Sequence, residues 1–250
     1  MCTVSVIPVA RGFRVMVNRD ESVLRPAALP PAWRTILAGD GTPIRAIWPV
    51  DPSGGGTWVG ASERGLLLTL LNYNLESAPG VPREVVTTGL RSRGEIIPQL
   101  LTHATADDAA SALERSDLRC YGPFRLLAID HVGGQDAGPR IREMRWDMQT
   151  LDVREAVTPP ACFASSGLGD SLVRVRGDLF SKMVSERGAE AATQEAFHEH
   201  AWPHATHLSV MMSRKGVQTV SVSTVEVSEG AGASRDVRFE YRAIARAENT

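Results

Sequence analysis

Short apolar runs of strand length occur in blocks along this chain, and helical segments separate the blocks. We expect strands over Thr3–Ile7, Phe13–Val17, Trp58–Ala61, Leu66–Leu71, Phe124–Asp130, Leu208–Met212, Val217–Val227 and Val237–Ala245. We expect helices over Gly94–His103, Ala106–Arg115 and Asp170–Ala191, the last interrupted at Gly177 and Gly188. Blocks of this kind indicate an α+β fold rather than alternating βαβ units. The simplest arrangement is a four-layer αββα sandwich, in which two mostly antiparallel sheets lie between two layers of helices.

The length and the charge restrict the function classes further. The chain has 250 residues and no linker rich in Pro, Gly or Ser, so we expect one domain over residues 1–250. Its 27 Lys and Arg against 29 Asp and Glu give a net charge of -2, without the excess of positive charge that is typical of nucleic-acid-binding proteins. We also expect no membrane span, because no run approaches the roughly 20 apolar residues that a bilayer requires. The start of the sequence lacks a secretory signal, and we expect a cytoplasmic protein.

The three cysteines differ in what they imply. They cannot all pair with one another, which favours a reducing compartment. Cys120 and Cys162 have no CxxC partner, and we expect them to be small buried groups. Cys2 becomes the N-terminal residue if the initiator methionine is removed. It then carries a nucleophile and, in its own α-amine, a base with a pKa near 8. The alternative is that a small residue at this position only suits processing.

Four polar residues, Asn18-Arg19-Asp20-Glu21, directly follow the second expected strand. A hairpin would return this segment to the level of Cys2. Arg19 could then lower the pKa of the thiol and help to hold an anionic group. Asp20 could accept a hydrogen bond from the terminal amine and orient it. The alternative is a solvated turn with a surface ion pair.

These residues belong to an ordered set of motifs that resembles a known family. Met1-Cys2 and Asn18-Arg19-Asp20-Glu21 are followed by Arg25-Pro26, Gly55-Gly56-Thr57-Trp58-Val59-Gly60, Leu71-Asn72-Tyr73, Ser92-Arg93-Gly94-Glu95 and, more weakly, Tyr121-Gly122-Pro123-Phe124-Arg125-Leu126-Leu127. The set resembles the NRDE family, also called the transport and Golgi organisation family. The likeness is densest from Cys2 to about Ile97.

The resemblance implies a fold of the N-terminal-nucleophile hydrolase type, related to choloylglycine hydrolases and penicillin V acylases. It implies Cys2 as the nucleophile, with Arg19 and Asp20 beside it. Asn72, at the end of an expected buried strand, is then the candidate oxyanion donor. On the same resemblance we assign substrate binding to four residues: Asn18, Trp58, Tyr73 and His207.

Two segments depart from the pattern of the relatives. Where the hydrolases have a second oxyanion Asn, this chain has Ser165-Ser166-Gly167-Leu168-Gly169-Asp170. His207 stands where the relatives have Arg in a Thr-Arg-Ser stretch. Losing one oxyanion donor can raise the barrier by about 2.7–4 kcal/mol.

Four of the six histidines lie between positions 198 and 207. His198, His200, His204 and His207 could supply ligands to zinc, and a single His could ligate haem. Their spacing matches no standard metal signature, and Pro203 prevents one helix from presenting all four. We favour a polar helix end followed by a loop, and assign no metal and no cofactor.

Two functions remain open from the sequence. The first is an amidohydrolase with an N-terminal cysteine, acting on a non-peptide C–N bond of a small-molecule amide. The second is a carrier on the same fold without turnover, because NRDE relatives are associated with haem movement and with acyl-CoA and lipid metabolism. A structural zinc protein is a third and weaker option. The sequence names no substrate and no oligomeric state.

Overall fold

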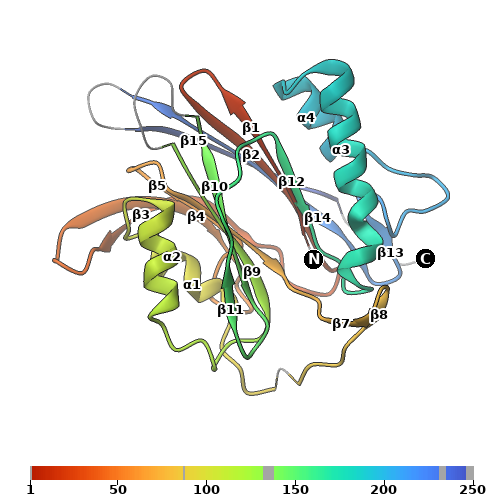
Figure 1. Ribbon diagram of the computed structural model, residues 1–250, viewed down its shortest axis with the longest axis horizontal. Coiled ribbons are helices and arrows are strands. Elements are labelled where there is room, and N and C mark those ends of the chain that lie inside the picture. Colours follow the sequence, from red (N-terminus) through yellow and green to blue (C-terminus); the bar gives the residue numbers. More distant parts are fainter. Residues whose placement is uncertain (1, 87, 132–137, 231–234, 246–250) are drawn as a thin grey trace.

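The computed structural model describes residues 2–86, 88–131, 138–230 and 235–245 (Figure 1). Its strands form two large sheets in which every strand pairing is antiparallel. Sheet A has the spatial order β12 (Ala161–Ala164), β1 (Cys2–Val9), β2 (Gly12–Ser22), β14 (Val217–Glu229) and β13 (Ser213–Arg214), and β15 (Arg235–Ala243) also pairs with β14. Sheet B has the order β11 (Leu151–Val153), β10 (Arg140–Trp146), β9 (Phe124–Asp130), β6 (Leu67–Asn72), β5 (Val59–Ser62), β4 (Pro43–Val50) and β3 (Leu29–Leu37). The short strands β7 (Glu76–Ala78) and β8 (Val81–Pro82) pair only with each other.

Helices cover the outer face of each sheet. The helices are α1 (Ile96–Leu100), α2 (Ala106–Glu114), α3 (Arg174–Arg187) and α4 (Ala191–His198). The first two pack on sheet B and the last two on sheet A, and Figure 1 shows the two pairs on opposite sides of the strands. Apolar clusters fill all three interfaces, with Val15 and Leu67 between the two sheets, Leu68 and Leu113 between sheet B and its helices, and Phe180 between sheet A and its helices. The predicted αββα arrangement is confirmed.

The alternation of side chains along β2 explains why both faces of sheet A are buried. Val15 and Val17 lie in the core between the sheets, whereas Arg14 lies on the helix side and donates to Gln194 of α4 at 2.8 Å. Successive strand residues point to opposite faces, so one strand serves both interfaces. The same rule places Arg19 and Asp20 on different faces of sheet A.

Two expectations about local structure were wrong. Leu208–Met212 is not a strand but a folded segment, in which the amide of Leu208 donates to Ala205 and that of Met211 to His200. A short apolar run can be buried in either form, so its composition does not distinguish them. Gly177 does not interrupt α3, because a glycine inside a helix lowers its stability without breaking it.

Strands β3 and β4 were missed by the sequence analysis. β3 contains Pro30 and Pro31 and is largely exposed, so it has neither the composition nor the alternation of a buried strand. It lies at the edge of sheet B, where proline is tolerated because one row of backbone groups has no strand partner. The sequence also predicts a loop over Val132–Arg140 and a turn at Gly230-Ala231-Gly232, and both lie mostly outside the described residues. No helix in the described part of the chain is long and apolar enough to cross a membrane.

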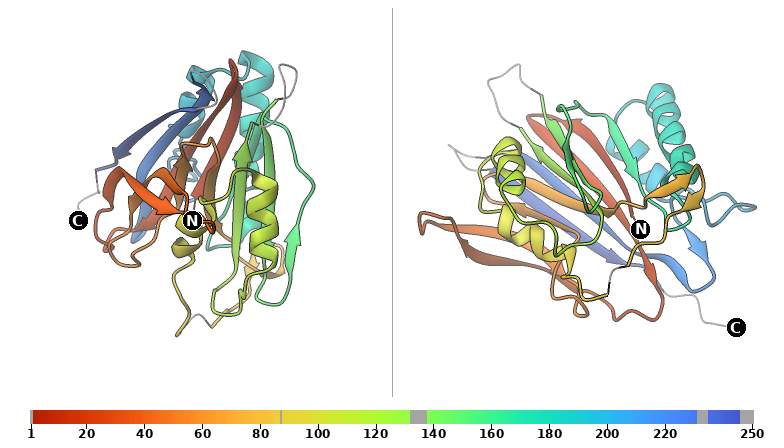
Figure 2. Two further views of the ribbon diagram at one scale, coloured as in Figure 1. Left: turned by 90° about the vertical axis from the view of Figure 1, so that its left-hand side faces the viewer. Right: turned by 60° about the horizontal axis from the view of Figure 1, so that its bottom comes forward.

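The N-terminal end of β1, beside the mark N, lies within the outline of the molecule in both views of Figure 2. This follows from the position of β1, which is flanked by β12 and β2 rather than placed at an edge. Cys2 therefore lies on an interior strand of sheet A, at the first residue of that strand.

His198 closes α4 against sheet A and is completely buried. Its Nδ1 donates to the side-chain oxygen of Asn18 at 2.8 Å, and its Nε2 accepts from the hydroxyl of Ser5 at 2.7 Å. Burial, together with the charges of the nearby Arg14 and Arg176, lowers the pKa of His198 to about 3. The ring is therefore neutral in the fold.

We predict that this buried ring makes the fold sensitive to acid. An unfolded histidine titrates near pH 6.5, so between pH 6.5 and about 3 the unfolded chain binds a proton that the folded chain does not. Stability is lost as the pH falls through that window, by about 2 kcal/mol between pH 6.5 and 5. Urea unfolding at both pH values should show a smaller loss for His198→Gln than for the native protein. An equal loss of unfolding free energy in the native protein and in His198→Gln would contradict the conclusion that a buried neutral His198 causes the acid sensitivity.

Candidate active site

The backbone of Cys2 is fixed on both sides. In the β1–β2 pairing Cys2 lies opposite Arg19, and on the other side the amide of Ser165 donates to the carbonyl of Cys2 at 3.0 Å. Cys2 is only 5% exposed and takes part in the apolar cluster between the sheets. The thiol thus occupies one defined place at the end of sheet A.

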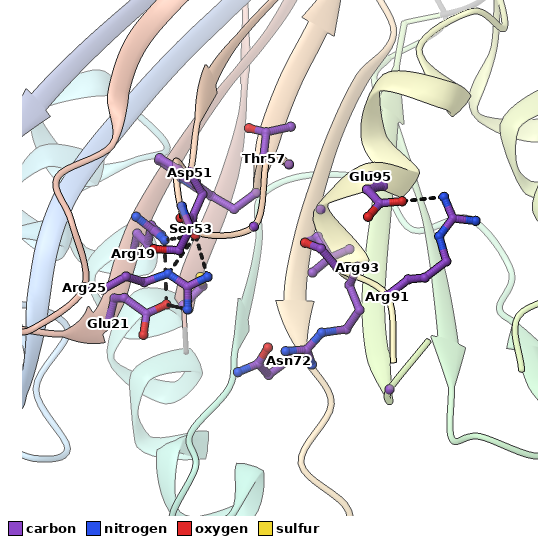
Figure 3. A pocket seen from close by; sticks show the side chains of 18 of the residues that line it. Arg19, Glu21, Arg25, Asp51, Ser53, Thr57, Asn72, Arg91, Arg93 and Glu95 are labelled. Carbon is purple, nitrogen blue, oxygen red and sulfur yellow. Dashed lines mark hydrogen bonds and ion pairs between the residues drawn. The ribbon is translucent and has the colours of Figure 1, made fainter. Parts of the chain in front are cut away.

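A cavity of about 640 Å³ opens beside this cysteine (Figure 3). Of the residues assigned to the site from the sequence, Arg19, Asp20, Trp58 and Asn72 line it together with Cys2. These side chains come from β1, β2, β6 and the loop before β5. Both sheets therefore contribute to one cavity.

Arg19 is held rigidly in the cavity wall. Its guanidinium donates to Asp51 at 2.7 Å and lies over the ring of Trp58 at 4.2 Å from the ring centroid. Asp51 also accepts a hydrogen bond from Arg25 at 2.8 Å. Burial raises the pKa of the Cys2 thiol, and the charge of Arg19 partly lowers it again. A cation fixed at this place favours the thiolate.

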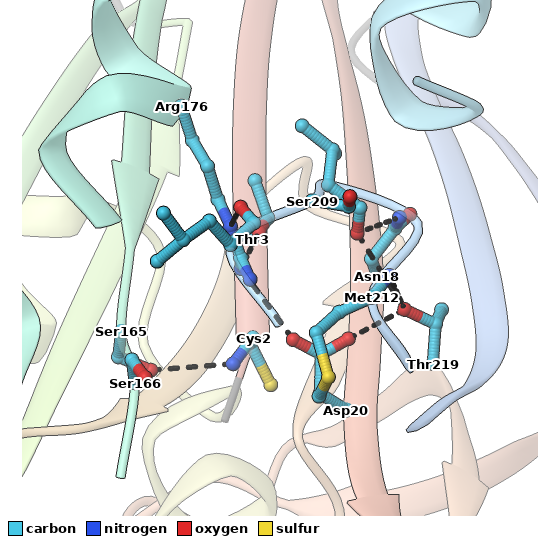
Figure 4. Close-up of polar contacts among 12 residues, drawn as sticks. Cys2, Thr3, Asn18, Asp20, Ser165, Ser166, Arg176, Ser209, Met212 and Thr219 are labelled. Carbon is cyan, nitrogen blue, oxygen red and sulfur yellow. Dashed lines mark hydrogen bonds and ion pairs between the residues drawn. The ribbon is translucent and has the colours of Figure 1, made fainter. Parts of the chain in front are cut away.

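Asp20 lies on the helix side of sheet A, in a buried network (Figure 4). One carboxylate oxygen accepts from the hydroxyl of Thr219 at 2.7 Å, and the other lies 3.4 Å from Arg176 of α3. Arg176 also donates to the hydroxyl of Thr3 at 2.6 Å. Burial raises the pKa of Asp20, and the charge of Arg176 opposes that shift. The network joins α3 to three neighbouring strands next to Cys2.

The backbone nitrogen of Cys2 donates to the hydroxyl of Ser165 at 3.2 Å. Figure 4 shows Ser165 and Asp20 on either side of Cys2. Ser165 begins the segment that departs from the relatives, where the sequence alone indicates only a missing Asn. The structure brings its hydroxyl to the nitrogen that would become the terminal amine.

Asn72 ends β6 opposite Phe124 of β9. Its side-chain amide lines the cavity and forms no hydrogen bond with another described residue (Figure 3). An amide that is half-buried and unpaired can donate to a ligand, as an oxyanion site requires.

Three of the predicted substrate-binding residues lie elsewhere. Asn18 is fully buried on the helix side, where its amide donates to the carbonyls of His198 and Val210 at 2.9 Å each. Tyr73 lines a second cavity of about 750 Å³ and not the one that Asn72 lines. His207 is exposed in a turn, because its segment is not a strand. The structure does not bring these three residues to Cys2.

Three residues at the site were missed by the sequence analysis. Arg93 and Asp51 line the cavity, and Arg176 holds Asp20. Arg176 was recognisable in principle, because it shares the buried face of α3 with Phe180 and Met183. Asp51 lies in the loop that follows β4, and nothing in its local sequence marks it as a partner of two arginines.

The described residues contain no group of three or more His, Cys, Asp or Glu side chains that could hold a metal ion. Both ring nitrogens of His198 already form hydrogen bonds, one with Asn18 and the other with Ser5. His204 and His207 are exposed. The four histidines therefore do not converge.

Comparison with known sequences places the chain in a family. A profile of the family described as Transport and Golgi organisation 2 matches residues 1–219. The chain belongs to this family. The resemblance that its motifs suggested is confirmed. A curated relative, Transport and Golgi organization protein 2 homolog of Bos taurus, is 32% identical over 115 residues, which are 45% of this chain and 37% of that protein. The match thus spans little more than a third of the relative.

Two solved structures with a similar fold are hydrolases by name. The Caenorhabditis elegans ortholog of N-acylethanolamine-hydrolyzing acid amidase has a TM-score of 0.54, with 12% identity over 90% of this chain and 92% of that one. A variant of conjugated bile acid hydrolase from Clostridium perfringens has a TM-score of 0.55, with 11% identity over 100% of this chain and 99% of that one. At this level of identity the likeness establishes the N-terminal-nucleophile hydrolase type of fold.

We predict that Arg176→Met strongly destabilises the fold. The change removes the cation beside a buried carboxylate, and leaving one member of a buried ion pair typically costs about 3–5 kcal/mol. Urea unfolding of Arg176→Met against Arg174→Met measures the effect, since Arg174 lies on the same helix and is exposed. A loss of less than about 1 kcal/mol, on the scale of a surface ion pair, would contradict a structural role for Arg176.

Proposed function

We propose that this protein is an amidohydrolase that uses an N-terminal cysteine to cleave a non-peptide C–N bond of a small-molecule amide. One observation carries the proposal: Cys2, Arg19 and Asn72 line a single cavity. The fold it shares with amide-cleaving hydrolases supports the same reaction class. We propose the cytoplasm as its location, on the sequence alone.

In the proposed reaction Met1 is first removed, so that the nitrogen of Cys2 becomes an α-amine. This amine takes the proton of the thiol, and the sulfur attacks the carbonyl carbon of the amide. The C–N bond then breaks as the proton passes to the departing amine, which leaves an acyl-enzyme. Water, with the same amine as base, hydrolyses the thioester and regenerates the thiol.

The surrounding residues have separate roles in this proposal. Arg19 lowers the pKa of the thiol. Asn72 donates to the oxyanion that forms at the carbonyl. Ser165, at 3.2 Å from the nitrogen of Cys2, orients the amine. Asp20 supports the same end of sheet A from the helix side.

A second candidate is a carrier that binds haem, acyl-CoA or another lipid in the same cavity without turnover. One observation favours it: burial raises the pKa of the Cys2 thiol, which reduces the thiolate present at neutral pH. A Cys side chain can also ligate haem iron as the thiolate, because coordination to a metal ion removes the proton of the thiol. Among the described residues that line the cavity there is no histidine, so Cys2 would be the ligand.

The first prediction for the enzyme concerns Cys2 itself. Intact mass spectrometry of the native protein should find Met1 absent. An electrophilic amide or lactone probe should then add one acyl group to Cys2, and none to Cys120 or Cys162. Cys2→Ala should abolish labelling, which identifies the thiol directly. Retention of Met1 would exclude this mechanism. Haemin binding that is lost in Cys2→Ala, without acylation of native Cys2, would favour the carrier.

The second prediction concerns the oxyanion. Asn72→Ala should slow acylation of Cys2 by about 100-fold to 1,000-fold, because one donor to the developing charge is lost. The rate of probe addition, followed by mass spectrometry, measures this. Asn74→Ala is the control, since Asn74 is two residues away and bonds Asp170 at the other cavity. Equal rates for the native protein and Asn72→Ala would remove Asn72 from the mechanism.

A further inference from the structure

Most of the charge on the cavity walls is internally balanced. Arg19 and Arg25 both bind Asp51, at 2.7 Å and 2.8 Å, and both lie 3.6 Å from Glu21, so two carboxylates balance the two cations. Arg91 binds Glu95 at 2.5 Å (Figure 3). These three guanidinium groups have carboxylate partners within the wall itself and need no ligand to neutralise them.

Arg93 is the exception among the arginines that line the cavity. It is half-buried, and its one hydrogen bond to a described residue goes to the neutral carbonyl of Pro123, at 2.8 Å. Within the described part of the chain it forms no ion pair. Burial lowers the pKa of Arg93, while Cys2 and Glu21 raise it from beyond ion-pair distance. The wall therefore contains a partly desolvated cation whose charge is not paired.

The backbone keeps Arg93 at this place. Gly94 packs so closely on Thr57 that an added Cβ would lie 2.7 Å from its backbone nitrogen. The amide of Thr57 also donates to the carbonyl of Gly94 at 3.1 Å. Figure 3 shows the side chain of Arg93 extending toward Asn72, on the side of the cavity where the oxyanion donor lies.

We propose that the cavity selects amides that carry an anionic oxygen group, a carboxylate or a phosphate, and that Arg93 binds that group. This inference rests on the proposed function, because it names the substrate class of the same site. A guanidinium has five N–H donors, of which one is used here, and its planar fork matches two oxygens of an oxyanion. Pairing a desolvated cation with such a group offsets the cost of its burial.

The competing role for Arg93 is to stabilise the thiolate of Cys2. The two roles give different results. A partner of the thiolate affects every substrate equally, whereas an anion-binding residue affects only substrates that carry the anion.

The experiment compares matched acylating probes. Mono-p-nitrophenyl adipate, its phosphonate counterpart and the neutral methyl ester share one chain length and one leaving group. The native protein should react faster with the anionic probes at Cys2, and the preferred anion distinguishes carboxylate from phosphate chemistry. In Arg93→Gln the anionic-to-neutral rate ratio should fall by about 10-fold to 100-fold, as expected for one lost charged hydrogen-bonding partner. Arg93→Lys should restore part of the ratio, and Arg91→Gln, exposed and paired with Glu95, should leave it unchanged.

Each outcome decides a different question. If Arg93→Gln leaves the anionic-to-neutral rate ratio unchanged but slows acylation by all three probes, the proposal is wrong and Arg93 instead stabilises the thiolate of Cys2. If no probe acylates native Cys2, the proposed reaction fails, and calorimetry then tests the inference alone. Native protein should bind N-butyladipamate more tightly than its methyl ester, and Arg93→Gln should lose that preference. Equal binding of the two compounds by the native protein would overturn the inference.

Discussion

A buried ion pair between Asp20 and Arg176 supports the end of sheet A where the cavity lies. Taking two charges out of water is expensive, and only good geometry with additional hydrogen bonds offsets the cost. Here the hydroxyls of Thr3 and Thr219 and the carbonyl of Leu208 supply those bonds. The pair thereby connects β1, β2 and β14 to the start of α3. The position of Cys2, at the first residue of β1, depends on this connection.

The two faces of β2 have different functions near this pair. Arg19 faces the cavity and is held by Asp51 and Trp58, while Asp20 faces α3. Adjacent residues of one motif are thus separated by the thickness of the sheet. Both residues line the cavity at this end of the sheet, but Arg19 is held from the side of sheet B and Asp20 from the side of α3, because the chain alternates sides at every step of a strand.

Much of this arrangement could be predicted from the sequence, because it depends on local patterns. Apolar blocks predicted the layers, and the hairpin geometry predicted that Arg19 returns to Cys2. The errors concern information that is not local. The role of Asn18 depends on α4, about 180 residues away, and that of Asp51 depends on which arginines approach it. Strand β3 carries prolines and exposed side chains, so its pairing with β4 leaves little trace in its composition.

The contact between Gly56 and Gly94 has a consequence for how this cavity could change during evolution. An added Cβ at Gly56 would lie 2.4 Å from the carbonyl carbon of Gly94, so the two loops touch through their backbones. The separation of these loops is set by main-chain atoms and not by side-chain size. Substitutions elsewhere in the wall can therefore alter the chemistry of the lining at constant width, whereas replacing either glycine would widen it. The ligand specificity of the cavity and its width can therefore change independently. Proteins that descend from this one could bind new ligands while the backbone around the cavity stays the same.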